Sequence, residues 1–566
     1  MIKGPLNITI SLLLSLLWAL PCIFAGNIST DVGPNLGCHL SPPLITGNLS
    51  RPGDIVIGGM FLIHVDRLYS KMDFKNRPDL KCQTMQLTSD KVLGCSFQAM
   101  IFAMEKINAN SDLLPNITLG FKIFDTCSAM RRAVEGTFWM LSGGSKSIPN
   151  YQWQEKTHLA GIIGDSGSVR SILMAQILGI YRYPQISYFA SSPILSNRNQ
   201  FPSFFRTIPS DEFQSRGLAQ LVTYFGWSWV GLLAIDNDYG LLGIQVIKEE
   251  LLMSGACVAF VENILTNLPN RNAPQIVKTI RESTARVIVV VSATFDFIPV
   301  LEELLRQNVS GKIWVASESW STSALLTSKR FQEILVGTIG FAIHSGWMLG
   351  FTEYLNSFHP SKYPDDDFAI DLWEHIFSCD WLEKRNNRTT QECTGGEKLE
   401  SYITKPDFRL SFNVYTSVYT FAWALQSLLQ CKSGSGPFHE GECANISSFR
   451  PWCQLLHYVK NTNFQADDKT RIFFNHNGDP PAIYDIVNWQ LGTSGDLEQM
   501  LLSAISAHGT CGRITNRIHA YCEKLQPSSP GPVDSLRNSQ ESADLACIRC
   551  NFAVPMFFVN KVINKL

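Results

Sequence analysis

The chain has 566 residues, of which 45% are hydrophobic and 17% are charged, and its formal net charge is -2. This length can hold two lobes with full-sized cores, and the composition is ordinary for a globular protein. The near-zero net charge gives no reason to expect nucleic acid as a partner.

The first 25 residues are typical of a secretory signal. Lys3 precedes an apolar run from Ile8 to Leu20, and small residues near Ala25 suit cleavage after that position. The mature chain would enter an oxidising compartment, where the 14 cysteines left after Cys22 is removed from the total of 15 are disulfide candidates. Six glycosylation sequons fit the same compartment: Asn27, Asn48, Asn116, Asn308, Asn387 and Asn445.

The segment after Gly53 is predicted to open an α/β lobe. DIVIGGMFLIHV indicates a strand, FQAMIFAMEKIN indicates a helix with one apolar face, and LLPNITLGFKIFDTC indicates a turn and a second strand. Residues 143–156 are expected to form a loop over the top of this lobe. Cys95 is either a buried thiol or bonded to Cys38.

Three β-α-β units follow. LAGIIG (Leu159 to Gly164) is a short apolar run, the apolar positions from Val169 recur at helical spacing, and PQISYFAS is a second apolar run. The pattern recurs as WVGLLAI with the loop DNDYG and a helix, and as RVIVVVSA with a helix and KIWVAS. Such units predict parallel sheets flanked by helices, with right-handed crossovers.

Ligands of such sheets bind beyond the carboxyl ends of the strands. Ser166, Ser168, Ser191, Tyr239 and Glu318 all follow strand ends in this way. The loop before the first helix offers backbone N–H groups and a positive dipole end that suit a carboxylate, whereas Glu318 suits a cation. Together these groups predict a pocket for a zwitterionic amino acid. For each residue taken singly, a helix N-cap or a packing role is an equally good interpretation.

Several runs also resemble one receptor family. SYFASS, LSNRNQFPSFFRTIPSDEFQ, GWSWVGLLAIDNDYG and GKIWVASESW are similar to the extracellular Venus-flytrap module of class C G-protein-coupled receptors. The similar groups are the calcium-sensing, type-1 taste and vomeronasal type-2 or fish olfactory receptors, and FHPSKYPDDDFAIDLWEHIFSC leans towards the last group. The resemblance covers Gly53 to Gln490 and implies a two-lobed, periplasmic-binding-protein-like fold.

The resemblance implies three crossings between the lobes. The first is expected at Thr207 to Asp211, the return near His344 and the last near Ala466. Lobe 1 would then comprise residues 26–208 and 344–466, and lobe 2 residues 209–343 and 467–490. The run NVYTSVYTFAWALQSLL predicts a long helix that packs under the sheet of lobe 1.

The resemblance also implies roles for cysteines. Cys82 would pair with Cys127, and Cys257 resembles the cysteine that tethers lobe 2 to a cysteine-rich stalk. Spacing alone suggests two local disulfides, Cys379–Cys393 and Cys431–Cys443. Residues 143–156 lack the cysteines that join two protomers in calcium-sensing relatives, so dimerisation would be noncovalent, through helix faces of lobe 1. The remaining pairings stay open: Cys38, Cys95, Cys453, Cys511, Cys522, Cys547 and Cys550.

After Gln490 the resemblance ends. Residues 491–566 are expected to be a divergent tail in which residues 526–542 are Ser/Pro-rich and Cys547 to Cys550 (CIRC) resemble a remnant of the stalk. A lone CxxC is a weak zinc signal, so no metal site is expected. No segment after the signal has the 18 or more apolar residues of a spanning helix, so the chain itself is not expected to couple to a G protein. A soluble isoform, an ectodomain and an incomplete gene model all fit this observation.

Seven residues are implied as ligand contacts: Ser166, Ser168, Phe189, Ser191, Asp211, Tyr239 and Glu318. The hydroxyls of Ser168 and Ser191, with backbone groups near Ser166 and Phe189, would hold an α-carboxylate. The acids and Tyr239 would hold the α-ammonium, partly by cation–π attraction. Phe189 stands where glutamate and calcium receptors commonly have a small residue. Leu410 stands where glutamate receptors have a basic contact, which argues against acidic amino acids as ligands.

The expected mechanism is closure of lobe 2 onto lobe 1 around the ligand, because only the closed form makes the contacts of both lobes. In a full-length receptor this module would lie on the extracellular face of the plasma membrane. No cofactor is expected, and Ca²⁺ is left open as a ligand or modulator. The alternative is a secreted amino-acid-binding or decoy protein that does not signal.

An enzyme is the competing class. GDSG at Gly164 to Gly167 matches the nucleophile turn of chymotrypsin-like proteases, but that fold is all-β and needs a His and an Asp upstream. Here the motif follows a parallel strand and opens a helix. No GxSxG, HExxH or P-loop occurs either, so we expect no enzymatic activity.

Overall fold

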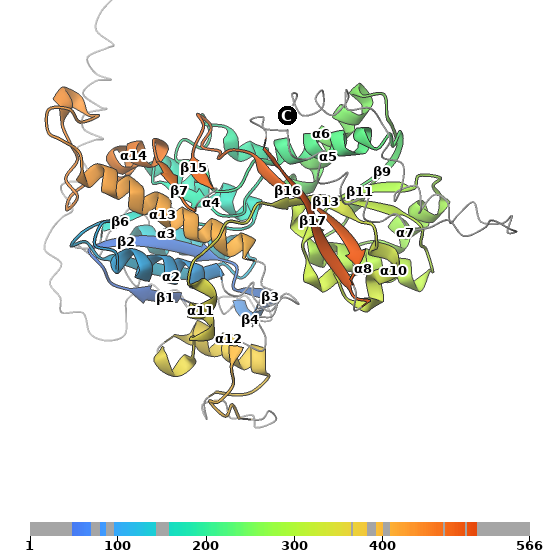
Figure 1. Ribbon diagram of the computed structural model, residues 1–566, viewed down its shortest axis with the longest axis horizontal. Helices are drawn as coiled ribbons and strands as arrows, with labels where there is room; N and C mark the ends of the chain where they lie inside the picture. The colour runs from blue at the N-terminus through green and yellow to red at the C-terminus, as the bar shows by residue number, and fades with distance from the viewer. Residues whose placement is uncertain are drawn as a thin grey trace, which may run out of the picture. The chain divides into compact units, whose positions relative to one another are not determined.

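The computed structural model describes residues 48–69, 80–85, 96–142, 158–363, 366–381, 392–399, 408–467, 470–492 and 495–506. These residues belong to one unit that begins at Ile45. Their strands form a six-stranded sheet, a seven-stranded sheet and two antiparallel pairs, β3–β4 and β14–β15 (Figure 1). Each large sheet is the centre of one lobe, which confirms the predicted two-lobed α/β fold.

The sheet of lobe 1 has the strand order β1-β5-β2-β6-β7-β8. Neighbouring strands are parallel except for β1, which is antiparallel to β5. The strands are β1 (Asn48–Arg51), β2 (Ile55–Phe61), β5 (Leu119–Asp125), β6 (His158–Ile163), β7 (Gln185–Ser187) and β8 (Phe204–Arg206).

Both faces of this sheet are covered by helices. On one face Ile57 packs in the core with α2 (Ser96–Asn108) and α13 (Arg409–Leu429), and on the other face Val56 packs with α3 (Met130–Ser142) and α4 (Ser168–Tyr181). Successive strand residues point to opposite faces, so a strand that is buried on both sides reads as a continuous apolar run. The long helix α13 is the one that the sequence predicts.

The sheet of lobe 2 has the order β10-β9-β11-β12-β13-β16-β17. The first five strands are parallel, and β13, β16 and β17 are successively antiparallel. The strands are β9 (Trp229–Ile235), β10 (Cys257–Ile264), β11 (Val287–Val291), β12 (Ile313–Ala316), β13 (Ile339–Ile343), β16 (Ile483–Leu491) and β17 (Leu497–Ser506).

Helices again cover the two faces of the lobe 2 sheet. Val289 packs with α5 (Asp211–Tyr224) and α6 (Asp238–Met253), whereas Val290 packs with α7 (Ala273–Glu282) and α8 (Thr294–Arg306). The remaining α-helices and β-strands are α9 (Glu318–Ser321), α10 (Gln332–Leu335), α11 (Phe351–Asn356), α12 (Asp367–Phe377), α14 (Leu456–Lys460), β3 (His64–Tyr69), β4 (Leu80–Met85), β14 (Asn463–Gln465) and β15 (Arg471–Phe473).

Within the described part of the chain, no helix combines the length and the apolar character that crossing a bilayer requires.

The last crossing between the lobes lies later than the expected position near Ala466. Strand β15 pairs with β14 and not with the lobe 2 sheet, and the next strand of that sheet begins at Ile483. The chain stays with lobe 1 because Asp479 is ion-paired with Arg206 of β8. We call residues 475–482 the third crossing.

The lobe 2 sheet also extends past Gln490, where the resemblance ends. Strand β17 pairs with β16 along its length, and Leu497 joins Trp489 in the core of lobe 2. Residues 497–506 of the expected tail are therefore part of the sheet. The pairing itself is irregular, because the register with β16 shifts between Ile486 and Val487.

The described residues contain three disulfides, Cys82–Cys127, Cys379–Cys393 and Cys431–Cys443, and they are the expected pairs. Several predictions fall outside the described residues: the signal at residues 1–25, the loop at residues 143–156, Asn27, Asn387, Cys38, Cys95 and the tail after Ser506.

Candidate functional site

The loop between β6 and α4 is organised by a buried aspartate. The carboxylate of Asp165 accepts hydrogen bonds from Thr126 Oγ1 at 2.6 Å and from Gly167 N at 2.7 Å. Arg170 Nη2 lies 2.7 Å from the same carboxylate and 3.4 Å from Ser166 Oγ. The backbone N–H of Gly167, one of the groups at the start of α4 that were expected to bind a ligand carboxylate, is therefore already hydrogen-bonded within the protein.

The neighbouring loop, which follows β7, carries the other predicted lobe 1 contacts. Ser168 Oγ accepts a hydrogen bond from Ser192 N at 3.3 Å, which holds the two loops together. The N–H of Phe189 donates to Ser187 Oγ at 3.4 Å, and its half-buried ring packs against the lobe 1 core. Ser191 is 4% exposed and points its hydroxyl to Asp211 instead of to open solvent.

A chain of hydrogen bonds joins Ser191 to the two predicted acids. Ser191 Oγ donates to Asp211 Oδ2 at 2.7 Å, and Gln214 Nε2 donates to Asp211 Oδ1 at 3.0 Å. The other end of the same amide, Gln214 Oε1, accepts from the N–H of Glu318 at 2.8 Å. Tyr239 completes the chain, since its hydroxyl lies 2.8 Å from Ser317 Oγ and 3.2 Å from Glu318 Oε2.

These contacts bring together groups from both lobes. Ser191 follows a lobe 1 strand, Asp211 begins α5 at the first crossing, and Tyr239 and Glu318 follow lobe 2 strands. Each lies where a parallel strand ends and a helix begins, as the rule for ligand sites of such sheets predicts. The seven assignments as ligand contacts stay predictions.

The two acids are unusually hard to ionise. Burial raises the pKa of Asp211 well above its ordinary value, and the nearby charge of Glu318 adds to the rise. Burial also raises the pKa of Glu318, although hydrogen bonds from Gln214, Ser319 and Tyr239 oppose the change. Two buried carboxyl groups that repel each other would be stabilised as anions by a cation placed between them. The site is thus chemically suited to an ammonium group.

Sequence reasoning missed three residues that shape this site, Gln214, Asp165 and Arg170. Gln214 could have been found, because it lies three residues after Asp211 and so shares a helix face with it. Asp165 and Arg170 are five residues apart on a loop and a helix, and only the fold shows that they pair.

The other predicted functional residues lie elsewhere. Cys257 is an exposed free cysteine at the start of β10, and its role as a stalk tether stays a prediction. Three sequon asparagines are exposed, Asn116, Asn308 and Asn445, while Asn48 lies in β1. Among the described residues, one group of metal-type ligands comes together, Cys82, Asp125 and Cys127, but the two sulfurs form a disulfide and are not available as thiolates.

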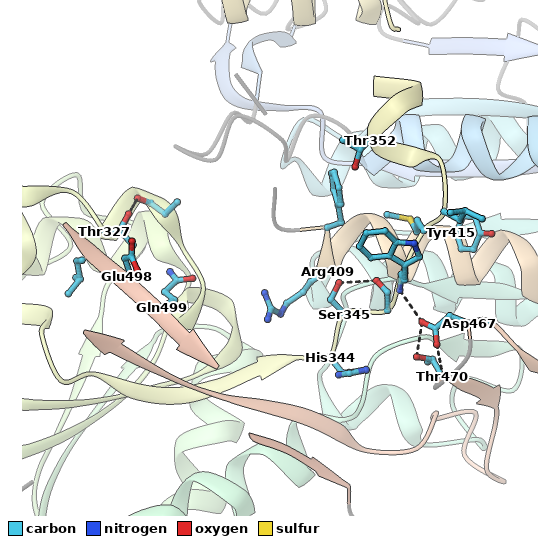
Figure 2. Close-up of a pocket in the computed structure, with 18 of the residues that line it drawn as sticks. Thr327, His344, Ser345, Thr352, Arg409, Tyr415, Asp467, Thr470, Glu498 and Gln499 are labelled. Atoms are coloured by element: carbon cyan, nitrogen blue, oxygen red, sulfur yellow. Dashed lines mark hydrogen bonds between the residues drawn. The ribbon is translucent and has the colours of Figure 1, made fainter. Parts of the chain in front are cut away.

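A separate cavity of about 1530 Å³ contains none of the seven predicted contacts (Figure 2). Figure 2 shows Thr327 and Glu498 on one side of this cavity and Arg409 on the other. Two of its polar residues are hydrogen-bonded to the backbone, since Arg409 Nε donates to Ile343 O at 2.7 Å and Asp467 accepts from the N–H of Trp347 at 3.0 Å. The seven predicted contacts therefore lie at the strand ends, apart from the residues that line this cavity.

Comparison with known proteins gives a consistent picture. Residues 96–492 match the family described as the receptor family ligand binding region. The chain is 37% identical over 476 residues to the extracellular calcium-sensing receptor of Homo sapiens, which covers 78% of this chain and 44% of that protein. It is 31% identical over 460 residues to taste receptor type 1 member 1 of Mus musculus, covering 78% and 50% of the two chains. It is 27% identical over 468 residues to G-protein coupled receptor family C group 6 member A of Homo sapiens, covering 78% and 49%. The chain thus spans 44–50% of the length of these three relatives.

Proposed function

This chain belongs to the family of receptor ligand-binding regions, in the extracellular form found in class C G-protein-coupled receptors, and we propose that it binds a free amino acid between its two lobes. The observation that carries the proposal is the hydrogen-bonded chain from Ser191 through Asp211 and Gln214 to Glu318 and Tyr239. Its two buried acids match an α-ammonium group, and the serine hydroxyls of lobe 1 match an α-carboxylate.

Electrostatics supports a ligand that carries a cation. Arg206, the arginine whose charge reaches Asp211, is itself ion-paired with Asp479. A ligand ammonium would therefore supply the counter-charge for Asp211 and Glu318. Ca²⁺ would also supply positive charge, two units instead of one, but it prefers six to eight oxygen ligands; it is a second candidate to be tested beside amino acids.

The wider role is proposed by extension from the relatives. In a full-length class C receptor, closure of the two lobes around the ligand would be the signal that reaches the G protein, and a second protomer would pack noncovalently against lobe 1. A secreted binding or decoy protein is the alternative. The run FHPSKYPDDDFAIDLWEHIFSC resembles vomeronasal and olfactory receptors, and on that basis the ligand would be a chemosensory signal.

The decisive experiment is calorimetric titration of the purified full chain with the twenty free L-amino acids and with Ca²⁺. We expect binding of at least one amino acid that is weakened about tenfold by Ser191→Ala and more strongly by Glu318→Ala, since the loss of a hydrogen bond to a charged group costs about 1.5–3 kcal/mol. Glu282→Ala on the exposed end of α7 is the matched control and should bind like the wild type. Unchanged affinity in both site variants would show that these residues do not form the ligand site.

A further inference from the structure

Arg206 is a fully buried arginine with acceptors on two segments, the connection that follows β7 and the third crossing. Its guanidinium donates to Ala190 O at 3.2 Å and to Ser192 O at 2.9 Å, which flank the predicted ligand contact Ser191. It also donates to Ser196 Oγ at 2.5 Å and to Asp479 Oδ1 at 2.7 Å. Because a guanidinium is planar and its N–H groups have fixed directions, displacing one acceptor disturbs the geometry of the others.

Asp479 lies on the third crossing, the segment that leads from lobe 1 into β16 of lobe 2. Its second oxygen, Oδ2, accepts from Ser196 Oγ at 2.9 Å, and the N–H of Arg206 donates to Gly478 O at 3.2 Å. Within the crossing, Asn475 and Asp479 exchange two hydrogen bonds, with Asn475 Oδ1 accepting from Asp479 N at 3.0 Å and Asp479 O accepting from Asn475 N at 2.9 Å. These bonds make residues 475–479 a closed turn that is fixed to Arg206 as one unit.

We propose that Arg206 is a positioning residue that couples the ligand loop Ala190–Ser192 to the third crossing through Asp479. Ligand bound at Ser191 would then influence the crossing that any movement of lobe 2 must bend, although Arg206 itself does not touch the ligand. The consequence for ligand binding rests on the proposed function. The coupling between the two segments does not rest on the proposed function, since the hydrogen bonds that carry it are present without a ligand.

The coupling is tested first without any ligand, by amide hydrogen exchange of the full chain. Asp479→Asn weakens the pair on the crossing, and we expect exchange in residues 187–196 to rise about tenfold, because Arg206 loses the charge that holds it in place. Ser196→Ala is a milder variant that keeps both charges and should raise exchange in residues 475–479 and 187–196 together. Ile280→Ala on α7 of lobe 2, another buried position, is the control for general loss of stability. Folded Asp479→Asn and Ser196→Ala proteins with wild-type exchange in residues 187–196 would overturn the proposal.

The effect on binding is measured with the free amino acid that binds the wild type most tightly in the calorimetric panel. We expect Arg206→Lys to weaken its affinity about tenfold, and Arg206→Lys with Asp479→Asn to weaken it no further than Arg206→Lys alone, because both act on one unit. Ile280→Ala should lower the melting temperature but keep the affinity within about twofold. If Arg206 had only a structural role, Arg206→Lys would have the same two effects. If Arg206→Lys behaves like Ile280→Ala, the proposal fails. If no amino acid binds the wild type, the proposed function fails and hydrogen exchange alone decides the coupling.

Discussion

Asp211 and Glu318 are the residues on which the proposed chemistry depends most. They are 2% and 6% exposed, respectively. The carboxylate of Asp211 accepts hydrogen bonds from Ser191 and Gln214. The carboxylate of Glu318 accepts hydrogen bonds from Tyr239 and Ser319. These hydrogen bonds limit the cost of burying two acids but do not remove it, because both pKa values remain raised. The free site therefore stores an unfavourable interaction that a cationic ligand would relieve.

Stability should consequently depend on pH in a defined direction. Above the ordinary pKa values of 3.8 for Asp and 4.5 for Glu, and below the raised values of Asp211 and Glu318, the folded chain binds more protons than the unfolded chain. The free energy of unfolding contributed by these acids should therefore fall as the pH rises through this window. Asp211→Asn with Glu318→Gln should flatten that decline in denaturant titrations between pH 4.5 and neutrality.

The control for this prediction is Glu282→Gln, since Glu282 is exposed on α7. It should leave the slope of stability against pH as it is in the wild type. A double variant at Asp211 and Glu318 with the wild-type slope would show that these acids are not the groups that titrate. With an amino acid bound, the slope should be smaller, because the ligand ammonium stabilises the ionised carboxylates.

Among the elements, β17 is the one that changes the limits of the ligand-binding region. It forms one of the two edge strands of the lobe 2 sheet, opposite β10, and contributes Leu497, which is 3% exposed, to the core. Without β17, strand β16 would become an open edge with unpaired backbone groups. Fragments intended for binding studies should therefore include this strand.

The contribution of β17 can be measured with two substitutions of the same kind. Leu497→Ala should lower the free energy of unfolding by about 2–4 kcal/mol, because it removes a buried side chain and leaves a cavity. Leu501→Ala lies four residues further along the same strand at a side chain that is 60% exposed, and it should change stability by less than about 0.5 kcal/mol. Equal effects of the two substitutions in chemical denaturation would contradict the packing of β17.

At the scale of the molecule, the described part of the chain has two large sheets with separate cores that are joined by three crossings. Ser191 follows a strand of lobe 1 while Glu318 follows a strand of lobe 2, so a ligand that contacts both would favour one relative position of the lobes. Binding energy can shift such an equilibrium only to the extent that the two positions differ in their contacts. The proposed ligand would satisfy that condition if its carboxylate met the serines of lobe 1 and its ammonium met Glu318 of lobe 2.

Movement of the lobes can be followed through two exposed free cysteines, Cys453 in lobe 1 and Cys257 in lobe 2. We expect energy transfer between maleimide dyes on these thiols to change when the best amino acid of the panel is added, and Glu318→Gln to abolish the change at the same ligand concentration. Chains with Cys257→Ser or Cys453→Ser show how much signal arises from other labelled sites. A ligand that binds tightly but leaves the transfer efficiency constant would speak against closure.

The order of elements could be predicted from the amino-acid sequence because each depends on local patterns. Continuous apolar runs such as Val287–Val291 mark strands that are buried on both faces, helical spacing marks α4 and α13, and the strand ends point to Ser191, Tyr239 and Glu318. The position of the third crossing, the pairing of β17, the hydrogen bond from Glu318 N to Gln214 and the Asp165–Arg170 pair required the tertiary structure. Each of these depends on contacts that form only when the chain folds. Such contacts produce no periodic pattern in the amino-acid sequence. Likewise, the raised pKa values of Asp211 and Glu318 arise from burial and mutual repulsion, which exist only once the chain has brought the two acids together.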